Sequence, residues 1–258
     1  MLRDYLRKAL AVILFSSLAI AAWAQEANPG RPTVSTPATL TPVGYLQFET
    51  GVLGAEHSPD LPNQISFNEV IKFSPAKRLE FLLQDQPFAH SDLGPFTSND
   101  PGDVSAGLQA VLLPGTETRP TISVSYFRRV WAGTAPDLDI GSNRQSAIFL
   151  VSTDVLHFHI DTNAIFNEQI EDARHRAQFG QTLSISHGLP HKLGVGGELW
   201  HFTQPFQNGH AAGFLFAPTY TPRPNLVFDV GFNRGLTSTS TRWDVFMGFT
   251  YLLPKKLL

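Results

Sequence analysis

The sequence predicts an all-β protein, namely a transmembrane antiparallel up-and-down β-barrel of about twelve strands. Three observations lead to this prediction. Apolar and polar residues alternate in one segment after another, the chain begins with the features of an export signal, and short turns alternate with long loops. Strict alternation gives a strand two unlike faces. Only helices and closed barrels can span a membrane.

Residues 1–24 have the features of a secretory signal peptide. Basic residues precede a short apolar run, and Ala22-Trp23-Ala24 forms a small-x-small cleavage site. No later stretch approaches the ~18 consecutive apolar residues that a transmembrane helix needs. Residues 25–42 are rich in Pro, Thr, Ser and Ala, so we expect a disordered periplasmic leader. The barrel is expected to cover residues 43–253, and residues 254–258 would form a short C-terminal tail.

The alternating pattern returns twelve times after the leader. The predicted strands are 43–54, 62–74, 77–89, 102–113, 119–130, 142–155, 156–167, 174–187, 190–203, 209–220, 223–234 and 242–253. Short turns and long polar loops alternate between them, which is typical of bacterial outer-membrane barrels with both chain ends on the short-turn side. A periplasmic β-sandwich is the alternative, although a sandwich has no need for loop lengths that alternate.

The composition excludes some other classes. The chain has 20 glycines, 20 phenylalanines and no cysteine, so it is not a disulfide-stapled extracellular scaffold. Its net charge of −3 gives no reason to expect nucleic acid as a partner.

The strand face opposite the apolar one collects charged and polar side chains, which we expect to line the barrel interior. They mix acids and bases, so the interior is either held together by ion pairs or guides a solute. The candidate lining residues are Glu49, Glu80, His157, His159, Asp161, Lys192, Glu198, Asp229 and Asp244.

Two chemical sites are considered as alternatives. His157, His159 and Asp161 are spaced i, i+2, i+4 and would share one face of a strand, as a metal site requires, but a third histidine would have to come from a neighbour such as His175 or His201. A lipid-hydrolysing barrel enzyme would need a Ser-His set, with Ser184 and Ser186 near His187, His191 or His201. No G-x-S-x-G motif is present. We therefore expect no catalytic residue, metal or cofactor.

Two further expectations concern the outer surface. Trp131, Trp200 and Trp243 lie near predicted strand ends, where aromatic rings favour the headgroup level of a bilayer. Glu69 breaks the apolar pattern of its strand, which indicates a bulge or a different register there.

The chain also resembles a known family of outer-membrane transporters, the one named for the MetA pathway of phenol degradation. The matching segments cover nearly the whole chain after the leader. They are Phe48-Glu49-Thr50-Gly51, Arg78-Leu79-Glu80, Pro101-Gly102-Asp103-Val104 with Gly107-Leu108, Glu198, Asp229-Val230-Gly231-Phe232 with Gly235-Leu236-Thr237, and Gly248-Phe249-Thr250-Tyr251. Gln109 stands where the family usually has a lysine, and the chain continues past Tyr251 where many such barrels end on an aromatic.

The resemblance implies a channel or transporter in the bacterial outer membrane for passive uptake of small solutes, aromatic or hydrophobic ones among them. Its partners would be outer-membrane lipid, the barrel-assembly machinery and the small-molecule solute. A lipid-modifying enzyme and a structural or adhesive barrel with a plugged lumen remain the alternatives.

Overall fold

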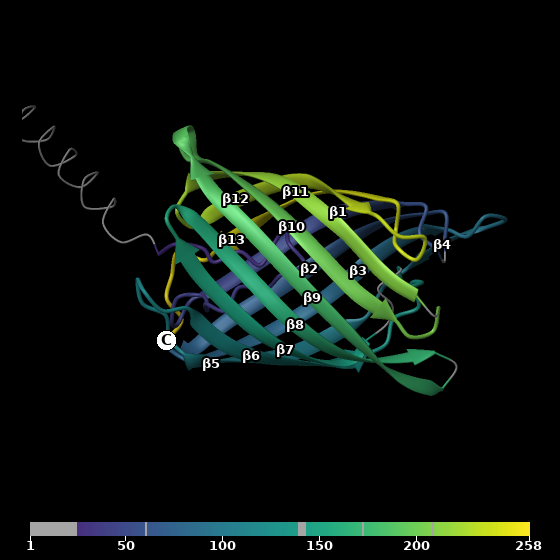
Figure 1. Ribbon diagram of the computed structural model, residues 1–258, viewed down its shortest axis with the longest axis horizontal. Helices are drawn as coiled ribbons and strands as arrows, with labels where there is room; N and C mark the ends of the chain where they lie inside the picture. Colours follow the sequence, from purple (N-terminus) through teal and green to yellow (C-terminus); the bar gives the residue numbers. More distant parts are fainter. Residues whose placement is uncertain (1–24, 60, 139–142, 172, 208) are drawn as a thin grey trace, which may run out of the picture.

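A computed structural model describes residues 25–59, 61–138, 143–171, 173–207 and 209–258. Within these ranges the chain forms one antiparallel sheet of thirteen strands, in which β1 pairs with both β2 and β13 and thereby closes a barrel (Figure 1). Twelve strands make up the wall, which confirms the predicted fold class. The predicted signal peptide, residues 1–24, lies outside the described residues.

Each wall strand is long enough to cross a bilayer when tilted, since ~9–11 residues suffice. The strands are β1 (Leu46–Glu56), β2 (Asn63–Ala76), β3 (Leu79–Asp92), β4 (Thr97–Asp100), β5 (Val104–Leu113), β6 (Thr121–Trp131), β7 (Asn143–Val155), β8 (Phe158–Glu171), β9 (Arg174–Leu189), β10 (Leu193–Gln204), β11 (Gly209–Arg223), β12 (Leu226–Gly235) and β13 (Trp243–Leu252). One short 3-10 helix, Pro190–Lys192, joins β9 to β10. In the described ranges no helix is long and apolar enough to cross a membrane.

The extra strand, β4, was not predicted. It pairs only with the end of β3, so it extends the wall beyond one end of the barrel (Figure 1). We call this end the long-loop end. The connections β1–β2, β3–β5 and β6–β7 lie there. The opposite end, where β2–β3, β7–β8 and β9–β10 are joined, is the short-turn end, and the C-terminus lies there (Figure 1).

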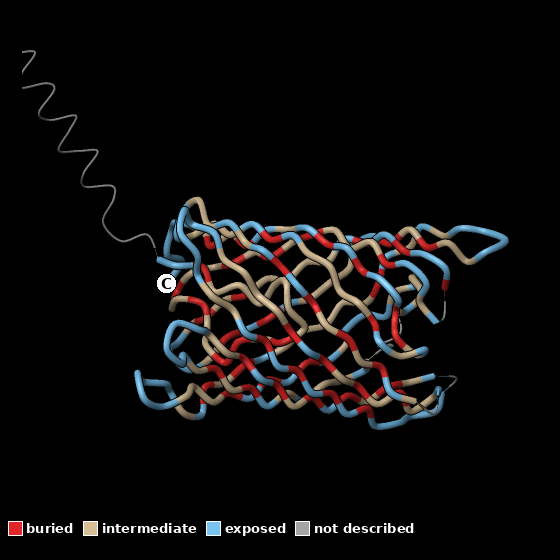
Figure 2. The backbone as a smooth tube through the Cα atoms, turned by 45° about the horizontal axis from the view of Figure 1, so that its top comes forward, coloured by how far each residue is buried: buried red, intermediate tan, exposed pale blue. Residues whose placement is uncertain are grey.

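The two faces of the wall have opposite polarity. Exposed apolar side chains such as Ile65, Phe81 and Val245 cover the outside, whereas Gln47, Ser66 and many other polar residues are buried inside. Buried and exposed positions therefore alternate along most strands (Figure 2). This is the polarity expected of a barrel that faces lipid outside and a polar lumen inside.

Four inward-facing aromatic rings each lie over a glycine on the neighbouring strand. Phe127 faces Gly107, Phe202 faces Gly180, Trp200 faces Gly213 and Phe246 faces Gly231 in the strand registers. A Cβ atom built on any of these glycines would lie 2.3–2.7 Å from the ring. The glycines thus leave room for rings to lie flat against the wall instead of filling the lumen.

Trp200 corrects one prediction about the membrane surface. Its side chain points inward, is 4% exposed and donates a hydrogen bond from Nε1 to Asn233 at 2.7 Å. The outward neighbour is Leu199, which is 60% exposed. Trp131 and Trp243 do face outward.

Glu69 faces outward, and the irregularity that the sequence indicated occurs opposite it. The β2–β3 register shifts between Phe67 and Glu69, and the additional residue lies on β3. Glu69 is consequently paired with Asp85, and both acidic residues also border the largest part of the lumen described below.

Candidate functional site: the barrel lumen

Residues 25–42, which we call the strap, run inside the barrel. The sequence predicted a disordered leader here, and the structure corrects this. The strap is bonded along its length to inward-facing side chains of the wall, from Asn28 near β1 to Thr41 near β3 (Figure 1, purple). Pro- and Thr-rich segments lack the apolar content to fold alone, but a polar lumen offers partners for their backbone groups.

Glu198 of β10 holds the middle of the strap. It is 3% exposed and accepts hydrogen bonds from Val34 N at 2.7 Å, from Ser35 N at 2.6 Å and from Ser35 Oγ at 2.6 Å. Ser35 Oγ is also within 2.7 Å of Thr182 Oγ1 on β9. A charged acceptor with three donors is a strong fixing point, since hydrogen bonds to charged groups contribute ~1.5–3 kcal/mol each.

Glu49 and Asp229 fix the strap near its beginning. Glu49 accepts bonds from Gly30 N and Arg31 N at 3.0–3.1 Å, and Lys72 Nζ lies 2.5 Å from its Oε1 atom. The Arg31 guanidinium lies across Asp229, with Nη2 to Oδ1 at 3.2 Å and Nε to Oδ2 at 3.4 Å. The ion pairs of Glu49 and Asp229 therefore lie inside the wall, where water screens them little.

The last part of the strap is held near the short-turn end. Glu80 accepts from Thr41 N at 2.8 Å and from the Thr41 hydroxyl. Gln109 donates from Nε2 to Pro37 O at 2.9 Å. Carboxylates accept from some of the strap N–H groups, whereas neutral wall side chains serve its carbonyls and its other N–H groups, as Asn163 does for both groups of Thr36.

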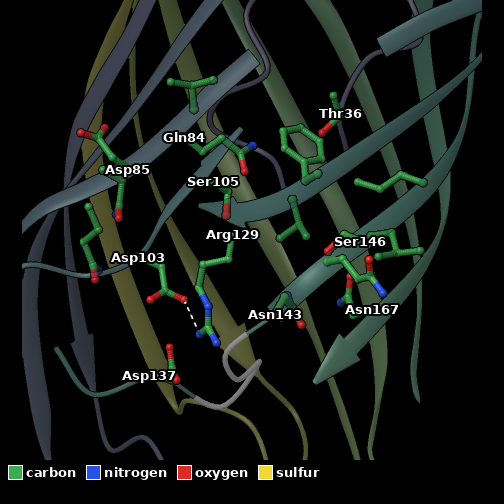
Figure 3. Close-up of a pocket in the computed structure, with 18 of the residues that line it drawn as sticks. Thr36, Gln84, Asp85, Asp103, Ser105, Arg129, Asp137, Asn143, Ser146 and Asn167 are labelled. Carbon is green, nitrogen blue, oxygen red and sulfur yellow. Dashed lines mark hydrogen bonds and ion pairs between the residues drawn. The ribbon is translucent and has the colours of Figure 1, made fainter. Parts of the chain in front are cut away.

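A cavity of about 460 Å³ lies beside the strap in the long-loop half of the lumen (Figure 3). One part of its lining is apolar and the other polar. The apolar part consists of four wall residues, Phe127, Ile148, Ile165 and Phe202, together with Val34 from the strap. The polar part includes Asp103, Arg129, Asp137, Ser146 and Asn167.

Residues 132–138, the described part of the connection from β6 to β7, border this cavity at its long-loop end. Gln64 of β2 donates to Pro136 O at 2.9 Å, so residues 132–136 extend from β6 past β5 and β3 to β2. Asp103 fixes the base of this loop by accepting from Gly133 N at 2.9 Å and from Arg129 Nη1 at 2.9 Å. Pro101 O accepts from Thr134 N and Ala135 N. The Pro-Gly-Asp segment noted in the sequence therefore anchors this loop.

A second cavity, of about 310 Å³, lies in the short-turn half. Arg31, Pro32, Thr33 and Pro37 of the strap line it, together with Asp161, Ser184 and other wall residues. Val34 and Thr36 line the first cavity instead. The strap therefore lies between two cavities, and its residues 31–37 contribute to both.

The structure places seven of the nine candidate lining residues on the inner face and two elsewhere. Six inward carboxylates are buried, and His159 lies beside two aspartates, with Nδ1 2.8 Å from Asp154 and Nε2 3.3 Å from Asp161. The seven are Glu49, Glu80, His159, Asp161, Glu198, Asp229 and Asp244.

His157 and Lys192 do not line the lumen. His157 is exposed in the β7–β8 turn, and its carbonyl accepts from His187 Nδ1 at 2.8 Å. Lys192 is exposed in the β9–β10 connection, where Nζ donates to Pro222 O at 2.6 Å. Both predictions extended the alternation into a turn, where the backbone no longer alternates. Leu156 and Lys192 both have positive φ angles there.

The same alternation separates the groups of the two alternative chemical sites. Ser184 faces inward, whereas His187 and His201 lie at outward positions of the wall, so these residues do not come together as a Ser-His set. His201 Nε2 lies 3.1 Å from His210 Nδ1 instead. The described residues contain no group of three or more His, Asp or Glu side chains placed to hold a metal ion.

Sequence reasoning missed several residues of the lumen. Lys72 follows the inward positions Gln64 and Ser66 at even spacing, so its place could have been predicted. Arg31, Ser35 and Thr41 could not, because the strap has no periodicity that connects it to the wall.

Comparison with known proteins places the fold among outer-membrane barrels. No family model matches the sequence, and no curated protein matches it significantly. Among solved structures, the COG4313 outer membrane channel from Pseudomonas putida F1 superposes with a TM-score of 0.60 at 12% identity, covering 88% of this chain and 100% of that chain. The KdgM porin superposes with a TM-score of 0.51 at 11% identity, covering 80% of this chain and 98% of that chain. At these identities the likeness establishes the barrel architecture.

Proposed function

We propose that this chain is a channel of the bacterial outer membrane that takes up small solutes by diffusion, and that the strap is the barrier within it. The observation that carries the proposal is the position of the strap between the two lumenal cavities. A solute that crosses the lumen has to pass residues 31–37. These residues are attached by hydrogen bonds and ion pairs, and the chain has no cysteine that could fix them covalently.

The surrounding features agree with this function. The outer face is apolar, the inner face is polar, and two barrels that superpose with TM-scores above 0.5 are named as a channel and a porin. Export by the signal peptide of residues 1–24 and insertion by the barrel-assembly machinery belong to the proposal, as does membership of the transporter family named for phenol degradation.

A disulfide lock provides the test. Ser35→Cys with Thr182→Cys replaces two side chains whose oxygens lie 2.7 Å apart, one on the strap and one on the wall. The pair is the only source of thiols because the natural chain has none. We expect the oxidised double variant to show no single-channel openings in a planar bilayer and the reduced form to open, because only the reduced strap can leave the lumen.

Each single cysteine variant serves as the control and should not respond to reductant. Equal conductance of the oxidised and reduced double variant would show that solutes pass without movement of the strap. Absence of openings in every form, with the barrel folded, would instead favour the second candidate, a structural barrel plugged by its strap. The many hydrogen bonds between strap and wall are what keep this candidate in consideration.

A further inference from the structure

In every hydrogen bond that the structure describes between a charged wall residue and the strap, the wall residue is the acceptor and the strap is the donor. Among the described residues, the charged wall groups bonded to the strap are the carboxylates of Glu49, Glu80, Glu198 and Asp229. The strap presents donors to each of them, either backbone N–H groups, hydroxyls or a guanidinium. Lys72 is the basic wall residue in this row, and its charge is matched by Glu49.

The strap thus acts as an internal ligand of the four wall carboxylates, and we call the part of the lumen that they line the acidic passage. Arg31 supplies a full positive charge to Asp229, and the N–H groups of residues 30–35 supply partial positive charge to Glu49 and Glu198. When the strap leaves, these buried carboxylates lose their donors. A buried acceptor without a donor is costly, so the passage then favours whatever replaces those donors.

The open cavity gives a second and independent indication. Asn167 lines it, is 5% exposed, and its Oδ1 atom accepts no hydrogen bond in the described structure (Figure 3). Its amide nitrogen already donates to Gln178 at 2.7 Å, which leaves the oxygen to be satisfied from another direction. Phe127 and Phe202 supply an apolar surface in the same cavity. The cavity therefore suits a molecule with a donor group and an apolar body.

We propose that the solutes of this channel are small organic cations, with an ammonium or guanidinium group on an apolar body, and that the strap occupies their path as a built-in mimic. The inference rests on the proposed channel function and adds the class of solute. The cationic group would follow the carboxylates that Arg31 and the strap amides now occupy, while the apolar body would pass over the rings of the cavity.

Ion selectivity is the first test. In planar bilayers with a KCl gradient across the protein purified from outer membranes, the reversal potential should show K⁺ favoured over Cl⁻ about fivefold, as several carboxylates in a confined passage produce. Glu198→Gln with Asp229→Asn should bring the ratio close to one. Glu56→Gln removes an exposed carboxylate at the end of β1 that lines neither cavity, and it should leave the ratio unchanged. A preference for Cl⁻, or a ratio that the double variant does not change, would overturn the inference.

A binding measurement tests the inference without conduction. Benzylamine and benzoate share a ring and differ in charge, and their affinities for the purified protein can be compared by calorimetry. In Arg31→Ala the carboxylate of Asp229 loses its guanidinium, so benzylamine should bind about tenfold more tightly than to the natural chain. Adding Asp229→Asn should remove this gain, and benzoate should gain nothing.

The outcomes separate the two proposals. Benzoate binding as tightly as benzylamine, or no gain in Arg31→Ala while that variant keeps the heat-modifiable mobility of a folded barrel, would overturn the assignment of organic cations. Loss of conductance in every variant would overturn the channel function alone, because the calorimetric comparison would still decide which charge the lumen binds.

Discussion

The two halves of the lumen share one barrel wall but are filled differently. Along the strap, which also borders a smaller cavity of about 310 Å³, carboxylates of β1, β3, β10 and β12 accept hydrogen bonds from residues 30–41. In the long-loop half, aromatic rings lie against glycines and leave a cavity of about 460 Å³. The difference shows that the wall by itself does not close the lumen. The buried carboxylates need hydrogen-bond donors, which the strap supplies, whereas the rings that lie against the wall leave space for a solute.

The comparison is tested most strongly by removing a fixing point of the strap. Glu198→Leu leaves three donors of the strap without their acceptor, and each lost bond to a charged group costs ~1.5–3 kcal/mol. We expect the strap to detach, with conductance rising several-fold and amide hydrogen exchange of residues 30–36 becoming rapid. Glu56→Leu, at an exposed carboxylate that lines neither cavity, is the matched control. Protected amides in Glu198→Leu would show that the other contacts are sufficient to hold the strap.

A second prediction concerns the rings that shape the open half. In Gly180→Val the new side chain would overlap Phe202, since a Cβ atom there would lie 2.3 Å from the ring. The ring must turn into the cavity, so conductance should fall and the barrel should be destabilised by ~1–3 kcal/mol, as measured by urea unfolding in micelles. Gly188→Val is the control because a Cβ atom at Gly188 meets nothing within 4 Å. Equal stability of the two variants would contradict the packing argument.

The loop over the cavity gives a smaller expected effect. Asp103→Ala removes the acceptor of Gly133 N and the partner of Arg129, but Thr134 and Ala135 still donate to Pro101 O. The Asp103 and Arg129 side chains are 28% and 18% exposed, so the loss should be ~1 kcal/mol or less after solvent screening. Single-channel recordings should show a noisier open level rather than a new conductance. An unchanged noise spectrum would show that Asp103 does not hold the loop.

The smallest effect on stability and selectivity is expected from a residue outside the lumen. Lys192→Ala changes a side chain that the sequence predicted in the lumen and the structure places in an exposed connection. Stability should change by less than ~0.5 kcal/mol, and ion selectivity should stay the same. A clear shift of the reversal potential would return Lys192 to the lumen and contradict the placement described above.

Much of the fold could be predicted because the alternation of apolar and polar residues within each strand shows which of its faces points inward. Glu49, Glu198 and Asp229 each have at least one outward apolar neighbour, namely Phe48, Leu199 and Phe228, so their inward direction follows from their neighbours in the chain. The same rule placed His157 and Lys192 wrongly, since it holds only while the backbone stays extended. It also placed Trp200 at the membrane surface, because an aromatic residue is compatible with either face.

The sequence by itself determined the barrel class, the strand segments and the inward carboxylates, because a period of two is a local property. The tertiary structure decided what those carboxylates bind. Residues 25–42 have no periodicity and too few apolar side chains to fold alone, and their N–H groups find acceptors only after Glu49, Glu80, Glu198 and Asp229 are brought around one lumen. The closing of the sheet, which pairs β1 with β13, creates that lumen and with it the site.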